Sequence, residues 1–197
     1  MMRTEIRIGA EVLSTDGPCG STVCVILDPI KERVTHLVVQ EGHLSAILRL
    51  VPVRSIRSTS SRRIALEATT EQFQEMGLFV ERRFLSPQQR IALMMLWPYV
   101  DPATALDLEH VRTPAGKIVL LGETPVRAQD GFIGRLDEFL IDRDDGRITD
   151  LVLREGHLWA RKDVVIPVAQ VKKIGQDAID LRLSKKELQT LPEIPAH

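Results

Sequence analysis

Residues 130–171 read DGFIGRLDEFLIDRDDGRITDLVLREGHLWARKDVVIPVAQV, and this stretch decides the fold. Turn signals at Asp130-Gly131, Asp145-Gly146 and Glu155-Gly156 separate runs that are rich in β-branched and aliphatic residues. Short apolar runs between glycine-containing turns are typical of antiparallel strands joined by hairpins. The stretch therefore predicts a short-stranded sheet that curls on itself.

An imperfect copy of this stretch lies earlier in the chain, from Asp16 to Ile56. The later copy holds one extra residue after its Glu-Gly-His turn. A correspondence over this length predicts two copies of one domain. The aligned pairs are Asp16-Gly17 with Asp130-Gly131, Gly20 with Gly134, Asp28 with Asp142, Glu41-Gly42-His43 with Glu155-Gly156-His157, and Val51-Pro52-Val53 with Ile166-Pro167-Val168.

Each copy is expected to contain about six short strands, and this number favours a small closed barrel because closure removes exposed sheet edges. The hydroxyl residues Thr69 and Ser184 are placed as N-caps, so a short helix is expected after each barrel. Phe139, Ile141, Leu151, Leu153 and Ile166 are the predicted core residues of the second copy. The strands expected in the two copies are 11–14 and 125–128, a longer strand that ends at Asp28 or Asp142, 34–40 and 148–154, a strand that reaches Pro52 or Pro167, and two more that end near Leu66 and Leu181.

The predicted fold class is therefore mainly β, with two six-stranded barrels that arose by internal duplication and a partly helical linker between them. The predicted domains are 1–76, 77–121 and 122–197. In the linker, Ser86-Pro87 is a helix-start signal, and residues 91–97 are apolar on nearly all sides. Such a helix must be buried, either within the monomer or against a partner or second copy of the chain, with Met94, Met95 and Trp97 as the expected contact residues.

Both copies resemble PRC-barrel domains, the small β-barrel also found in the H subunit of the photosynthetic reaction centre and in a ribosome-maturation factor. The match is good over most of residues 124–183 and looser over 9–68. The earlier copy departs at residues 28–32, which hold no glycine before the third strand. The resemblance implies a non-catalytic barrel that docks onto a larger assembly. The residues that carry it are Val126, Asp130-Gly131, Gly134, Asp142, Gly146-Arg147-Ile148-Thr149, Leu151-Val152-Leu153, Gly156 and Val165-Ile166-Pro167-Val168.

Composition excludes some classes of protein. The chain is 44% hydrophobic, which is enough for folded cores, and its net charge is −1, which provides no global field for nucleic acid or anionic membranes. No segment approaches the length of a membrane span, so a cytoplasmic protein is expected. Cys19 and Cys24 have no cysteine counterparts in the later copy, and ordinary reduced thiols are expected. No cofactor and no metal are expected.

The Glu-Gly-His turns are the first candidate site. They place Glu41 and His43, and again Glu155 and His157, at equivalent positions of the two barrels. These pairs of carboxylate and imidazole either bind a metal or polar ligand or simply support the turns. Trp159, next to His157, is an aromatic residue of the kind enriched at binding hot spots, or else it covers the barrel mouth.

The second candidate site is a cluster of arginines. Arg54, Arg57, Arg62 and Arg63 alternate with serines and a threonine, and both residue types contact phosphates. The cluster is where RNA would bind, although a solvated loop also accounts for it. The run from Asp142 to Gly146 is interpreted as an Asp-rich turn rather than a calcium loop, because it lacks the terminal bidentate glutamate.

The leading functional hypothesis is a non-enzymatic adaptor that binds a protein partner through barrel loops and the linker helix. The first alternative is an RNA- or ribosome-associated factor, and the second is a sensor of metal or small ligands. No Gly-rich phosphate loop, nucleophile elbow or paired metal-binding histidines are found in the sequence, so no catalytic residue is assigned.

Overall fold

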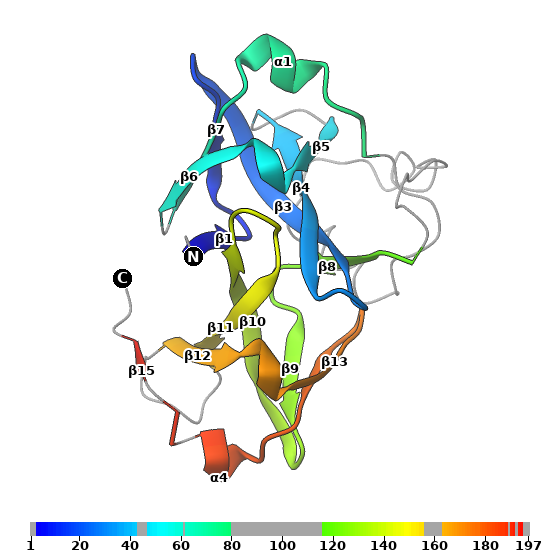
Figure 1. The fold of residues 1–197 in the computed structure, drawn as a ribbon, viewed down its shortest axis with the longest axis vertical. Helices are drawn as coiled ribbons and strands as arrows, with labels where there is room; N and C mark the ends of the chain where they lie inside the picture. Colours follow the sequence, from blue (N-terminus) through cyan, green and yellow to red (C-terminus); the bar gives the residue numbers. More distant parts are fainter. Residues whose placement is uncertain are drawn as a thin grey trace.

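The computed structural model describes residues 3–42, 47–60, 62–79, 116–155, 163–188, 190–191 and 193–194. Within these residues the protein is mainly β, with two sheets and two short α-helices. The two sheets lie one above the other along the longest axis of the molecule (Figure 1). The predicted linker helix and its Ser86-Pro87 start lie outside the described residues.

The first sheet has seven strands and is built mainly from the first third of the chain. Its longest strand is apolar from Val23 to Leu27 without interruption, because Ile26 and Leu27 face buried clusters on opposite faces of the sheet. The strand order is β5 (Leu48–Pro52), β4 (Arg33–Glu41), β3 (Pro18–Asp28), β2 (Glu11–Leu13), β7 (Arg63–Leu66) and β6 (Ile56–Ser60), with β8 (Ile118–Leu121) paired to β3.

The second sheet has eight strands, and all but one come from residues 125–194. The strand order is β13 (Val171–Ile174), β14 (Ile179–Leu181), β9 (Pro125–Ala128), β10 (Gly131–Asp142), β11 (Ile148–Glu155), β12 (Asp163–Pro167) and β15 (Glu193–Ile194), with β1 (Arg3–Arg7) paired to β10.

The two sheets share one strand order. From β5 to β6 and from β12 to β13 the strands follow in the same sequence, and each path includes one parallel pair, β2 with β7 and β9 with β14. The short 3-10 helices η1 (Val53–Ser55) and η2 (Val168–Gln170) also occupy matching positions. Both sheets are larger than the predicted six strands, since each also pairs a strand from the other half, and the second sheet contains β15 as well. Among the described residues neither strand order closes on itself, so closed barrels stay a prediction.

The additional strands are exchanged between the halves. β1 precedes the first set of strands in the chain but pairs with β10, and β8 precedes the second set but pairs with β3. The registers match as well, because Thr4 lies opposite Ile141 while Ile118 lies opposite Leu27. Each half therefore completes the sheet of the other.

One apolar core runs through both halves. It joins residues of the first sheet, such as Val25 and Leu37, to residues of the second sheet in a single cluster of buried side chains. Burial of this apolar surface is the main force that holds the halves together. The five core residues predicted for the second copy all belong to it, with exposed fractions of at most 5%, and this prediction is confirmed: Phe139, Ile141, Leu151, Leu153 and Ile166.

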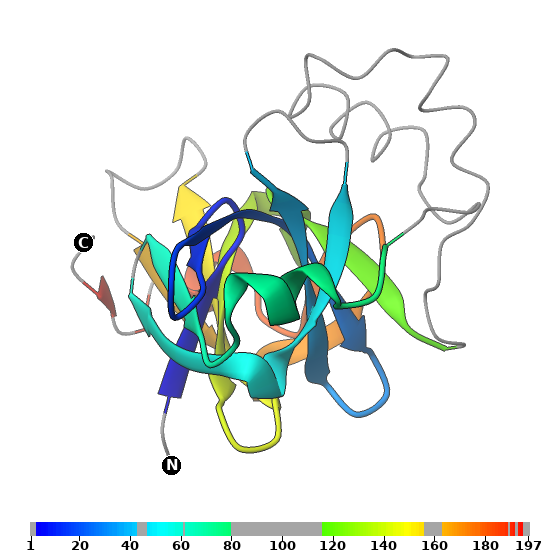
Figure 2. The ribbon, with the colours of Figure 1, turned by 90° about the horizontal axis from the view of Figure 1, so that it is seen from above.

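The two helices begin as predicted from their hydroxyl residues. α1 (Thr70–Gln74) has Thr69 as its N-cap, with a capping box to Gln72. α4 (Lys185–Leu188) follows Ser184, whose side chain accepts a hydrogen bond from the Glu187 amide at 3.4 Å. Seen from above, α1 lies over the first sheet, whose strands curve beneath it (Figure 2). None of the helices in the described ranges has the length and apolar character needed to cross a membrane.

Candidate functional site

The two halves meet at the turns that join their longest strands. The β3–β4 turn and the β10–β11 turn form an antiparallel bridge between Arg33 and Arg147. The Val34 amide donates to the Gly146 carbonyl at 2.9 Å, and the Ile148 amide donates to the Glu32 carbonyl at 2.8 Å. These two hydrogen bonds fix the turns against each other, and we call this region the junction.

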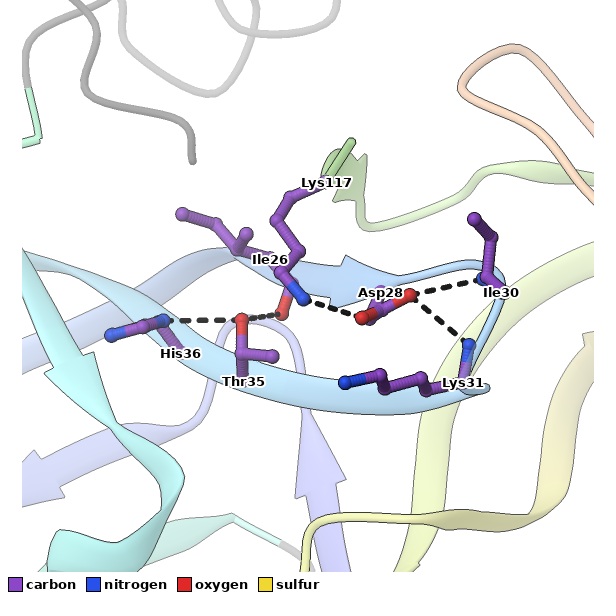
Figure 3. A network of polar contacts seen from close by, with 7 residues as sticks. All are labelled: Ile26, Asp28, Ile30, Lys31, Thr35, His36 and Lys117. Carbon is purple, nitrogen blue, oxygen red and sulfur yellow. Dashed lines mark hydrogen bonds and ion pairs between the residues drawn. The ribbon is translucent and has the colours of Figure 1, made fainter. Parts of the chain in front are cut away.

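Asp28 holds the β3–β4 turn in place (Figure 3). Its Oδ1 atom accepts hydrogen bonds from the amides of Ile30 at 3.1 Å and Lys31 at 3.0 Å, and its Oδ2 atom lies 2.5 Å from Lys117 Nζ. The hydrogen bond from Lys117, followed by those from the backbone, lowers the pKa of the Asp28 carboxyl below its ordinary value. Asp28 thus connects the amides of its own turn to Lys117, the residue that precedes β8.

A cleft of about 380 Å³ opens at the junction. One wall is formed by β4 and η1 of the first half, and the other by the β10–β11 turn. The cleft is rich in charge, with more cations than carboxylates. The cations are Lys31, Arg33, Arg54, Lys117 and Arg143, and the carboxylates are Asp28, Asp144 and Asp145.

His36 lies in the wall of this junction cleft. Its Nδ1 atom is 3.1 Å from the Thr35 hydroxyl, which itself donates to the Ile26 carbonyl at 3.1 Å (Figure 3). Because the hydroxyl proton is already used, Nδ1 must be the donor and Nε2 carries the lone pair. Burial, and then the positive charges of Arg54 and Lys117, lower the pKa of His36. The imidazole is therefore neutral at physiological pH.

The second sheet has a matching position with different charges. His36 pairs with Pro52 across β4 and β5, and Asp150 pairs with Pro167 across β11 and β12. Asp150 is buried and forms an ion pair with Arg3 at 2.7 Å. The middle residue of η1 is Arg54, whereas the middle residue of η2 is Ala169. The first half thus carries an imidazole and a guanidinium where the second half carries a carboxylate and a methyl group.

Glu41, a predicted site residue, has a structural role. Its carboxylate accepts hydrogen bonds from Arg49 Nε at 2.9 Å and from Gln74 at 3.2 Å. Arg49 also donates to the Met76 carbonyl and lies over the Phe73 ring, 6.0 Å from its centroid. The carboxylate therefore ties the end of β4 to α1.

Neither Glu41 nor Glu155 lies at the junction. Glu41 ends β4 and Glu155 ends β11, and these strands run in opposite directions from the bridge between Arg33 and Arg147. No cluster of three possible metal ligands is found in the described ranges. The other predicted contact residues lie outside the described residues: His43, His157, Trp159, Met94, Met95 and Trp97.

The four arginines do not form one surface. Arg54 lines the junction cleft, and Arg57 lies exposed on β6. Arg62 and Arg63 line a different hollow of about 500 Å³, where Arg63 pairs with Glu11 at 3.0 Å. The structure thus separates the arginine nearest the junction from the other three.

Sequence reasoning did not single out His36, Lys31 or Lys117. These residues come together only through the exchange of β8, which brings Lys117 beside a turn far away in the chain. One signal was present in the alignment of the two copies, because His36 falls on Asp150. A change of charge between otherwise similar copies points to a position where the copies differ in role.

Replacement of Lys117 by methionine is expected to raise the pKa of Asp28 toward its ordinary value, since the ammonium group is the largest cause of the lowered pKa. A pKa that is lower in the folded protein stabilises the fold above the unfolded-state pKa, and this stability is lost as the pH falls. The variant should therefore show less of this loss in acid. Titration of the side-chain carboxyl signals by NMR measures the pKa directly. Lys31→Met is the matched control, because Lys31 contacts Asp28 through its amide, and an equal shift there would contradict the assignment.

The comparison with protein families finds a match in the second half of the chain. Residues 121–188 match the family model for the PRC-barrel domain, and this range runs from the last residue of β8 to the last residue of α4. No curated protein matches the chain. A PRC-barrel domain is thus present at residues 121–188.

Proposed function

We propose that this protein is a non-enzymatic docking module that binds a protein partner at the junction of its two halves. The observation that carries the proposal is Ile30, whose exposed fraction of 88% is the largest among the exposed large apolar residues of the described part. It sits at the tip of the β3–β4 turn, between Asp28 and the cleft residue Lys31. A large apolar side chain held in solvent costs free energy that contact with a partner would recover.

The turn is suited to this role because hydrogen bonds hold its backbone in place before binding. Asp28 fixes the amides of Ile30 and Lys31, and Lys117 fixes Asp28 in turn. A preorganised anchor loses little conformational entropy when it binds. Full burial of an isoleucine side chain contributes roughly 1.5–3 kcal/mol, which is enough for Ile30 to act as a hot spot.

We also propose that the whole chain is a tandem of two PRC-type barrels. Support comes from the common strand order and the matching registers of the exchanged strands β1 and β8. Glu32, with φ of 50°, occupies the left-handed position that Gly146 occupies in the other turn, with φ of 73°. The departure from the family pattern at residues 28–32 is thus compatible with the same turn shape.

Replacement of Ile30 by aspartate is expected to abolish capture of the partner. A photoreactive benzophenone amino acid at position 29, introduced in the source cell, should form a discrete adduct with one protein. That adduct should disappear when Ile30→Asp is combined with it, because the anchor is lost. Phe132→Asp is the matched control, since Phe132 is exposed by 47% in the second half and lies away from the junction. An adduct that survives Ile30→Asp, or recovery of the bait alone, would count against a docking role for this turn.

An RNA-associated factor is the second candidate, and the exposed Arg57, Arg62 and Arg63 favour it. Arginines on an accessible surface neutralise phosphates, and binding of this kind weakens steeply with salt. The absorbance ratio at 260 and 280 nm of protein purified at low salt tests the idea, together with co-sedimentation with ribosomes. A clean protein spectrum and no co-sedimentation would rule against it.

A further inference from the structure

We infer that the junction cleft receives an extended acidic segment of the protein partner, with apolar side chains of that segment packed on Ile30. This inference rests on the proposed docking function and names the chemistry of the partner. It is carried by a cleft with an excess of cations beside an exposed apolar anchor on the same turn.

The charges of the cleft are only partly balanced within the described residues. Lys117 is paired with Asp28, Arg33 with Asp145 at 2.9 Å, and Arg143 with Glu67 at 3.2 Å. The exposed residues that remain are two cations and one carboxylate, and they have no ion-pair partner in the described part of the chain. They are Lys31, Arg54 and Asp144. An excess of positive charge in a partly enclosed cleft attracts carboxylates and steers their approach.

The matching position of the second sheet lacks this excess of positive charge, so the excess belongs to the first half only. There, Asp150 and Ala169 replace His36 and Arg54, and Arg3 is neutralised by Asp150. The remaining sheet pairing is alike, so the fold itself does not require the cations. The first half thus differs from the second by the positive charges that an acidic ligand needs.

The spacing of polar and apolar groups favours an extended peptide over a compact anion. Ile30 and Lys31 are neighbours on the turn, so an apolar contact and a cation are presented side by side. Arg54 lies on a separate element, η1, in the wall that η1 forms with β4. A peptide with alternating acidic and apolar residues can reach both, and a small oxyanion offers no apolar group to Ile30.

The test is a binding measurement with a defined probe, the fluorescein-labelled peptide Glu-Leu-Glu-Glu-Leu-Glu, followed by fluorescence polarisation at low salt. The purified full-length chain should bind it, and Arg54→Ala should weaken binding by about tenfold, the scale expected for loss of a charge-assisted contact. Arg57→Ala is the matched control, since Arg57 is also an exposed arginine of this segment but does not line the cleft. It should bind like the unchanged protein.

A second readout reports the site directly. When a carboxylate enters the cleft, its negative charge should raise the pKa of His36, which NMR titration of the imidazole signals can follow. In the free protein, burial and then the charges of Arg54 and Lys117 lower the pKa of His36, and the Thr35 hydroxyl fixes its tautomer. A peptide bound elsewhere would leave this pKa unchanged.

Several results would overturn the inference. They are equal binding of Gln-Leu-Gln-Gln-Leu-Gln, equal weakening by Arg54→Ala and Arg57→Ala, no binding of the acidic peptide, or an unchanged His36 pKa. Tighter, Arg54-dependent binding of polyuridylate would assign the cleft to nucleic acid instead. Failure of the peptide while the position-29 adduct persists would refute the acidic segment and leave the docking function standing. Absence of that adduct when Ile30 is retained would refute the docking function itself.

Discussion

Replacement of Ile6 by aspartate is expected to destabilise the second half of the molecule, although Ile6 lies at the start of the chain. Ile6 is fully buried on β1, opposite Phe139 of β10, and belongs to the common core. The change removes a packed isoleucine and places a carboxylate among apolar side chains. Core truncations of isoleucine cost about 2–5 kcal/mol, and burial of an unpaired polar group adds to this cost. We expect a loss of about 4 kcal/mol or more.

Denaturation with guanidinium chloride measures the loss, and hydrogen exchange of the amides locates it. Protection should fall in β10 and β11 as well as in β1, because β1 is hydrogen-bonded to β10. Glu5→Ala is the matched control, since Glu5 is only half-buried on the opposite face of the same strand, and its effect should stay within about 0.5 kcal/mol. If Ile6→Asp left β10 and β11 fully protected, the exchange of β1 between the halves would be refuted.

The exchange of β1 and β8 also explains what the sequence could not predict. The strands of each half follow from local patterns, because the turns at Asp130-Gly131 and Gly146 and the apolar runs between them are encoded nearby. The burial of Phe139 and its neighbours follows from the same alternation. The partner of β1 is a different matter, because a short strand with alternating residues fits any open sheet edge, and its register is fixed only by packing far away in the chain.

The candidate site could not be predicted from the sequence for the same reason. The cleft combines residues 28–36, the η1 segment, Lys117 and the β10–β11 turn, which are adjacent only in the folded protein. The arginines are close together in the sequence, but the fold places Arg54 at the junction cleft and Arg62 and Arg63 at another hollow. Glu41 is one of the predicted interaction residues, and in the structure its carboxylate accepts hydrogen bonds from Arg49 and Gln74.

Gly146→Ala is expected to be the most damaging single change at the junction. Gly146 has φ of +73°, and a Cβ atom there would lie 2.4 Å from the Val34 carbonyl oxygen. Backbone atoms cannot give way as a flexible side chain can, so the turns must separate. The hydrogen bond from the Val34 amide to the Gly146 carbonyl would then be strained or lost. Left-handed backbone costs a non-glycine residue about 1–2 kcal/mol, and the clash and the hydrogen bond bring the expected loss to about 2–4 kcal/mol.

The equivalent change on the other turn should have the opposite sign, and the pair of variants tests the symmetry of the junction. Glu32 already occupies the left-handed region with φ of 50°, so Glu32→Gly removes that strain and should stabilise the protein by up to about 1 kcal/mol. Chemical denaturation of both variants against the unchanged protein measures the two effects. Equal stability of Gly146→Ala and the unchanged protein would mean that the two turns do not meet as described. Because residues of both turns line the cleft, Gly146→Ala should also weaken binding of the acidic peptide, whereas Glu32→Gly should preserve it.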